Sequence, residues 1–328
     1  MLAILYLAPW LLGGCVMIRC LLPRHRPLNR LWMGCSLGLL MLMWLPALAA
    51  LALDFTQEAH LAALGGLALM VFFSLALRDR RPAAGWDREE RRQLWLILWI
   101  MVPFTALFTW LQYTHVYRVA EDGSWWVGQS TYGDLPMHTA FITGLKNASF
   151  PPEYPFYPGH RLSYPFLTDS LSTTFYLLGC SLQATTIIPA VLMFMLLCAG
   201  VTILGRELSF CKRAVILASL LFLLNGGLGF IYDFDLAGGV DSEGRPELLN
   251  RISAIMTGFY KTPTNQPDPN NLRWSNIIAD LFVPQRTLLG GYCMALPCFY
   301  LLWTGMGEKR EECGGWRQTA LLGVWAGA

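Results

Sequence analysis

The chain has 328 residues, of which 55% are hydrophobic and only 14% are charged. Its formal net charge is +2, so it lacks the basic excess that accompanies nucleic-acid binding. The hydrophobic residues form long uninterrupted blocks rather than amphipathic stripes, a pattern that excludes an ordinary soluble domain. The composition therefore indicates an all-α, polytopic membrane protein.

A helix that crosses the hydrocarbon core of a bilayer needs about 20 apolar residues. By this rule, spans are predicted near residues 2–22, 31–53, 60–77, 94–113, 184–204, 213–231 and 287–304. A further span begins near Gln318 and is incomplete at Ala328, so we expect a C-terminally truncated fragment. The first block has no basic n-region or clear cleavage site, which favours a retained helix over a signal peptide.

The arginines of the short loops predict the orientation. They surround the first loop (residues 19–30) and the third loop (residues 78–92), whereas the second loop, Asp54 to His60, contains acids and no Arg or Lys. Cytoplasmic loops carry the excess of basic residues. We therefore expect an integral protein of a bacterial plasma membrane, with the N-terminus and the large loops outside.

The segment 164–179 is apolar enough to be mistaken for another span. Its sixteen residues reach only about 24 Å as a helix. Leu167, Leu171 and Phe175 follow helical spacing, with Thr, Ser and Asp between them. This pattern predicts a short helix that lies in the membrane interface.

These boundaries divide the chain into alternating membrane and external regions. They are a four-span region (1–113), a first large external loop (114–183), two spans (184–231), a second large external loop (232–286) and C-terminal spans, the last incomplete (287–328). Loops of this length are usually functional or disordered. The first is rich in Trp, Tyr and Phe, which favour the membrane–water boundary, so we expect it to fold as a cap on the bilayer.

Asp134 and His138 are the most informative polar pair of this cap. The residues from Asp134 to Asn147 are predicted to form a short helix, with Pro136 in its first turn. A spacing of four places Asp134 and His138 on one helix face. Asp134 is then either a general base or metal ligand assisted by His138, or simply a helix cap worth about 1 kcal/mol beside a packing histidine. The residue pattern alone favours the role of Asp134 as a helix-capping residue.

The order of features over residues 113–208 resembles the GT-C class of membrane glycosyltransferases, such as the aminoarabinose and protein mannosyl transferases. A span ends outside, Gly133-Asp134 opens a short helix, a Pro/Tyr-rich stretch (PPEYPFYPGHRLSYPF) follows, and a second helix leads into the next span. The resemblance implies transfer of a sugar from a polyprenyl-phosphate donor to a glycan, lipid or protein acceptor, with inversion and without a nucleotide sugar. Here the acidic loop follows the fourth span rather than the first, so three helices would be an N-terminal addition.

The resemblance also reverses the preference for a simple cap and gives Asp134 the position of the family's first-loop acid. Such a carboxylate takes a proton from the acceptor hydroxyl or holds a divalent cation that neutralises the leaving phosphate. His138 stands in place of the second acid of many relatives, as a second ligand or as a group that orients Asp134. A divalent cation is therefore an implied cofactor, and dependence on it stays open.

A lipid-phosphate donor needs cations at the outer membrane surface, and the planar guanidinium of arginine suits phosphate. The candidates are Arg161, Arg273 and Arg286, with Lys261 as a weaker one. Arg286 is preferred because it opens the span near Thr287, although an arginine that snorkels from a helix end fits the pattern equally well.

The second external loop holds several acids, among them Asp233 and Asp235, but it lacks the spacing of an EF-hand, so we expect solvated side chains. Two other functional classes remain open. A transporter or flippase would carry ionisable residues within its spans, and these spans are almost free of them. A non-catalytic scaffold would use the cap to bind another protein.

Overall fold

The computed structural model describes residues 2–128, 131, 133–209, 211–226, 249–250, 252–253, 256, 265–266, 272–273, 276–306 and 315–327. The structure is mostly helical, with 74% helix, as expected for an all-α protein. Six of the described helices are long and apolar enough to cross a membrane: α1 (Leu2–Leu21), α2 (Pro27–Leu53), α3 (Gln57–Ala76), α4 (Arg88–His115), α7 (Leu182–Leu208) and α11 (Arg286–Met306). The polytopic prediction is therefore confirmed.

The other described elements are short. The helices are α5 (Leu135–Leu145), α6 (Leu167–Leu177), α8 (Lys212–Leu223), α13 (Trp316–Ala326) and the π-helix η1 (Ile277–Phe282). Three antiparallel hairpins pair β1 (Arg118–Val119) with β2 (Trp125–Trp126), β3 (Glu153–Tyr154) with β4 (Tyr157–Arg161), and β5 (Asn265–Gln266) with β6 (Leu272–Arg273). The described parts of the predicted spans 213–231 and 318–328 are α8 and α13, with 12 and 11 residues, too short to cross a bilayer alone.

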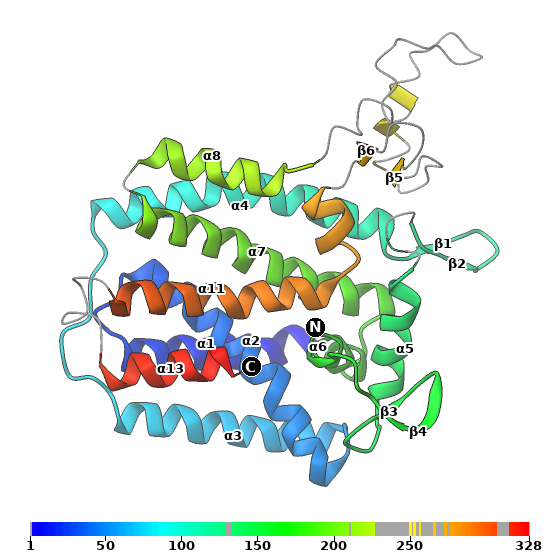
Figure 1. Ribbon diagram of the computed structural model, residues 1–328. Coiled ribbons are helices and arrows are strands. Elements are labelled where there is room, and N and C mark those ends of the chain that lie inside the picture. Colours follow the sequence, from blue (N-terminus) through cyan, green and yellow to red (C-terminus); the bar gives the residue numbers. More distant parts are fainter. Residues whose placement is uncertain are drawn as a thin grey trace.

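The long helices lie side by side, with α2 among the most deeply buried (Figure 1). Glycines bring α1 and α2 together: a Cβ atom on Gly14 would meet the backbone carbonyl of Gly34, and one on Gly38 would meet that of Trp10. Small residues of this kind let membrane helices approach closely. Because the hydrophobic effect does not drive helices together within lipid, van der Waals packing between such close helices stabilises their association. Helices α1 and α2 are thus packed closely against each other.

The cap forms at one end of the bundle, between α4 and α7. In Figure 1, α5 runs across the direction of the long helices at the right-hand side, with the β1–β2 and β3–β4 hairpins around it. The loop between α2 and α3 joins this end, because the backbone NH of Phe55 donates to the carbonyl of Ala148 at 2.8 Å. The predicted folded cap is present, and it contacts both the loop after α2 and the helices that flank it.

Helix α6 corrects one prediction. It is not a span, as expected, but neither does it lie half-exposed in the interface: its residues from Thr168 to Phe175 are all buried. The helix packs against α5, α7, α2 and α11. Its hydroxyls are satisfied locally or by neighbours; for example, Thr173 donates to the carbonyls of Asp169 and of Ile142 in α5. Such bonds make a polar helix tolerable in the interior.

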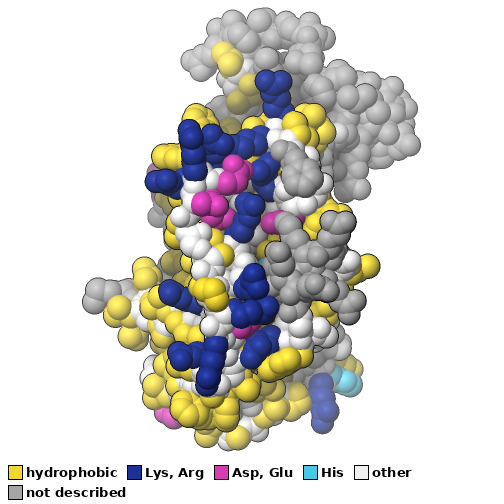
Figure 2. Space-filling view, turned by 90° about the vertical axis from the view of Figure 1, so that its left-hand side faces the viewer, with side chains coloured by type: hydrophobic (Ala, Val, Ile, Leu, Met, Phe, Trp, Pro, Cys, Tyr) yellow, Lys and Arg dark blue, Asp and Glu magenta, His cyan; other side chains and the backbone are white. Residues whose placement is uncertain are grey.

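The opposite end of the bundle is basic. Figure 2 shows Lys and Arg side chains gathered over that face, with a few Asp and Glu among them. Exposed arginines there include Arg24, Arg78, Arg80, Arg88 and Arg91. The cap and the basic residues therefore occupy opposite ends of the same helices.

Candidate active site beneath the cap

A buried charge cluster joins the cap to the bundle. Asp169 of α6 is 0% exposed and accepts hydrogen bonds from Nη2 of Arg286 at 2.6 Å and from Nδ1 of His138 at 2.8 Å. The other terminal nitrogen of Arg286 donates to Oγ of Ser172 at 2.7 Å. An ionised side chain is costly to bury unless it is paired and hydrogen-bonded. These contacts therefore fix α5, α6 and α11 relative to one another.

The cluster changes the expected roles of two residues. His138 is 1% exposed and its ring faces Asp169 rather than Asp134, with which it shares only the bond from its backbone NH to the Asp134 carbonyl. Arg286 is 2% exposed, so its guanidinium contacts protein groups and not the bilayer surface. The prediction that Arg286 meets a lipid headgroup is thus replaced by a buried ion pair that positions the cap.

Asp134 lies at the N-terminal end of α5, in the place that the sequence predicts. Its side chain accepts no capping hydrogen bond from the helix, so the simple capping role is not observed. The carboxylate is half-buried, and among the described residues its side-chain hydrogen bond comes from Nε2 of Gln285 at 3.4 Å, at the outer limit for such a bond. Asp134 is therefore held weakly, beside the residue that precedes Arg286.

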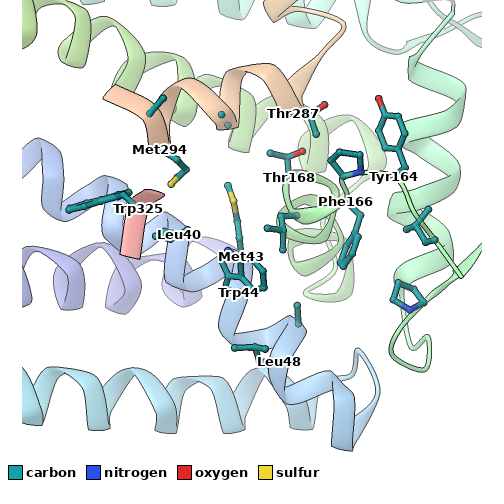
Figure 3. Close-up of a pocket in the computed structure, with 18 of the residues that line it drawn as sticks. Leu40, Met43, Trp44, Leu48, Tyr164, Phe166, Thr168, Thr287, Met294 and Trp325 are labelled. Atoms are coloured by element: carbon teal, nitrogen blue, oxygen red, sulfur yellow. The ribbon is translucent and has the colours of Figure 1, made fainter. Parts of the chain in front are cut away.

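A large apolar groove opens below the cap. It has a volume of about 970 Å³ and lies between α2, the loop before α6, α11 and α13. Its walls include Leu40, Met43, Trp44, Met294 and Trp325 (Figure 3). Leu48, Leu51 and Phe299 on its walls are 50%, 60% and 55% exposed, so the groove communicates with the lipid-facing surface of the bundle. Its size suits the apolar chain of a lipid.

Three hydroxyl groups gather at the cap end of this groove. They belong to Tyr164, Thr168 and Thr287, which Figure 3 shows near one another, away from Trp325 and Met294. The Tyr164 ring packs edge-on against His138, with centroids 5.8 Å apart. Burial raises the pKa of Tyr164, and the negative charges of Asp134 and Asp169 raise it further, while a hydrogen bond with Thr287 opposes them. Tyr164 thus lines the groove and is close enough to both carboxylates for their charges to affect its pKa.

The remaining predicted residues are not brought to this place. Arg161 is exposed at the end of β4 and does not itself line the groove, although the next residue, Leu162, does. Arg273 lies in β6, of which only the backbone is described, and Lys261, Asp233 and Asp235 lie outside the described residues. Among the residues that the structure describes, no group of three or more His, Cys, Asp or Glu is placed to hold a metal ion.

Sequence reasoning missed two features of the site. Asp169 was grouped with the polar residues of an interfacial helix and given no role, yet it is the buried anion that pairs with Arg286. An acid within a Thr/Ser-rich helix and an arginine at the start of an apolar span are a pair that the chain could have indicated, since neither charge is stable alone in a nonpolar environment. The groove joins residues more than 200 positions apart, and no local pattern marks it.

Comparison of this chain with family models, curated proteins and solved structures returns no match in any of the three.

Proposed function

We propose that this protein transfers a sugar from a polyprenyl-phosphate donor to an acceptor hydroxyl at the cap end of the bundle. The observation that carries the proposal is the apolar groove of about 970 Å³, which begins among lipid-facing residues and ends at hydroxyls close to the weakly held carboxylate of Asp134. A lipid substrate in such a groove has its chain in an apolar environment and its polar head beside a base. This is the arrangement that a membrane-embedded transferase requires.

In the proposed reaction, Asp134 is the general base. Its carboxylate takes the proton from the acceptor hydroxyl as the acceptor oxygen forms a bond to the anomeric carbon. The bond between that carbon and the phosphate oxygen breaks, and polyprenyl phosphate leaves with the electron pair. Attack from the face opposite the leaving group inverts the anomeric configuration. A divalent cation would assist by neutralising the leaving phosphate.

Asp134 suits this role better than Asp169. A base must be free to accept a proton, and within the described part of the chain the oxygens of Asp134 are engaged only by the long contact with Gln285. Asp169 instead holds two short hydrogen bonds to Arg286 and His138, and its loss of charge would leave a buried guanidinium unpaired. The cluster around Asp169 positions α5 and thereby Asp134.

The difference between the two ends of the bundle supports the proposed orientation. Basic residues gather on the end opposite the cap (Figure 2). Because basic loops stay in the cytoplasm, the cap and Asp134 lie on the non-cytoplasmic face, where polyprenyl-linked sugars can be used without a nucleotide.

The test compares lipid-linked sugars and envelope glycans by mass spectrometry in cells that express the wild type, Asp134→Asn or Glu121→Gln. Glu121 is an exposed acid of the same cap and is the matched control. We expect the glycosylated product to be lost in Asp134→Asn alone, at equal protein level. Addition of EDTA to the purified protein, followed by Mg²⁺ or Mn²⁺, tests the cation. Equal product in wild type and Asp134→Asn would refute the proposed function.

A further inference from the structure

The polar end of the groove has a specific chemical character. Its described polar side chains are hydroxyls, from Tyr164, Thr168, Thr287 and Ser163, and no Lys or Arg is among the described residues that line it. The nearest deeply buried cation is Arg286, whose terminal nitrogens are engaged by Asp169 and Ser172. A lipid head in the groove therefore meets hydrogen-bonding groups without an available positive charge from the described lining.

One of these hydroxyls has no partner within the described structure. Thr168 is 5% exposed, and its Oγ1 atom is buried without a hydrogen bond. Buried polar atoms in folded proteins are nearly always satisfied by protein, water or ligand. Thr168 lines the groove, so its unpartnered oxygen lies within the wall against which a bound molecule would pack. The side chain is also fixed: a Cβ atom added to Gly290 of α11 would collide with the Thr168 methyl group.

Asp134 has no cationic partner among the described residues, whereas the charge of Asp169 is balanced by Arg286. Asp134 and Asp169 both act on the Tyr164 hydroxyl in the direction that keeps it protonated, raising its pKa. A phosphate monoanion in the same place would be repelled by the carboxylate of Asp134 in a medium of low dielectric constant. An uncharged hydroxyl has no such cost, and it can accept a hydrogen bond from Tyr164 while it donates one to a carboxylate or to a threonine.

We infer that the groove binds the acceptor rather than the donor, and that the acceptor is a lipid with an uncharged, hydroxyl-bearing head. Its chain lies between α2 and α11, and its hydroxyl meets Tyr164, Thr168 and Thr287, on the side from which Asp134 acts. The name acceptor rests on the proposed function, whereas the preference for a neutral lipid alcohol over a lipid phosphate rests on the groove alone.

The experiment measures binding without turnover. The full chain is purified and placed in phosphatidylcholine nanodiscs, labelled with a diazirine analogue of farnesol, and the labelled peptides are mapped by mass spectrometry. Unlabelled farnesol and farnesyl phosphate, which have the same chain, then compete for the site. We expect labelling on α2 and α11, and at least about tenfold stronger competition by farnesol.

Variants separate a ligand contact from a structural role. Thr168→Val and Tyr164→Phe should each weaken farnesol about three- to tenfold, the size expected for one lost hydrogen bond. Thr168→Val should not lower the melting temperature, because the oxygen it removes has no described protein partner. Gly291→Trp should abolish labelling by filling the groove, since a Cβ atom there meets nothing within 4 Å. Tyr157→Phe, on the exposed β4, is the control and should change nothing.

The outcomes distinguish the two proposals. Equal or stronger competition by farnesyl phosphate, or labelling that Gly291→Trp leaves intact, would overturn the acceptor assignment. Farnesyl phosphate could compete more strongly than farnesol while Asp134→Asn still abolishes product. In that case only the acceptor assignment is refuted, and the groove is assigned to the donor. If Asp134→Asn leaves product unchanged, the proposed function falls, whichever lipid binds.

Discussion

The two carboxylates beneath the cap, Asp169 and Asp134, differ in how the protein holds them. Asp169 is 0% exposed and has two short charge-assisted hydrogen bonds, to Arg286 and His138. Asp134 is half-buried, and the described residues offer it one side-chain hydrogen bond, from Gln285 at 3.4 Å. A carboxylate that is fully paired stabilises a structure, whereas one that is held weakly beside a cavity is available for proton transfer. We therefore propose that Asp169 has the structural role and Asp134 the chemical one.

Removal of either member of the buried pair should have the largest effect on stability. Arg286→Ala leaves Asp169 as a buried charge without its main partner, and Asp169→Ala does the same to Arg286. Each should lower the free energy of unfolding by about 3–5 kcal/mol, measured by denaturant titration in detergent micelles. Asp122→Ala, an exposed acid of the β1–β2 turn, is the control. A stable Arg286→Ala protein would contradict the structural role of the cluster.

Replacement of both charges should cost less than replacement of one. The double variant Asp169→Leu with Arg286→Met has no unpaired ion, so we expect it to be more stable than either single alanine variant. Denaturant titrations of the double variant and of its matched singles, Asp169→Leu and Arg286→Met, give the coupling free energy between the two positions. Strictly additive losses would show that the ion pair is not the source of the stability.

A smaller loss of stability is expected when the contact between α11 and α6 is overpacked. The methyl group of Gly290→Ala would overlap with Thr168, whose β-branched side chain is fixed in α6. Overpacking of this kind typically costs about 1–3 kcal/mol, and the melting temperature measures it. Gly291→Ala is the matched control, because its added methyl group meets nothing within 4 Å. Equal melting temperatures for the two variants would contradict the described packing.

The smallest effect concerns pH. Burial and two nearby carboxylates raise the pKa of Tyr164 above its usual value of about 10. Its hydroxyl therefore stays a hydrogen-bond donor at neutral pH and loses its proton only in alkali. The difference in farnesol affinity between the wild type and Tyr164→Phe should be constant from pH 6 to about pH 9. Above that range, the wild type should bind farnesol more weakly. Disappearance of this difference between pH 7 and pH 8 would show that the phenol ionises readily.

Much of the membrane architecture could be predicted from the chain. The uninterrupted apolar blocks have lengths close to those of α1 to α4, α7 and α11. Such blocks identify spans because each apolar residue makes the transfer of the whole segment from water into the bilayer more favourable. The position of Asp134 at the start of a short helix was also accessible, since Pro136 and the spacing to His138 are local signals.

The pairing within the site was not accessible in the same way. His138 is four residues from Asp134 but bonds to Asp169, 31 positions away, and Arg286 reaches the same acid from 117 positions away. Helical spacing says which side chains share a face and not which partner a folded loop brings to that face. Burial of α6 likewise depends on how the cap closes over the ends of α2, α7 and α11.

The decisive measurement is a side-by-side assay of glycan transfer and melting temperature for Asp134→Asn and Asp169→Asn. We predict that Asp134→Asn loses transfer by about a hundredfold or more, as expected for a missing general base, while its melting temperature stays within error of the wild type. Asp169→Asn should instead have a lower melting temperature than the wild type, and any loss of transfer should follow from that lower stability. Normal transfer by Asp134→Asn, or loss of its activity only in step with unfolding, would contradict the division of roles between the two acids.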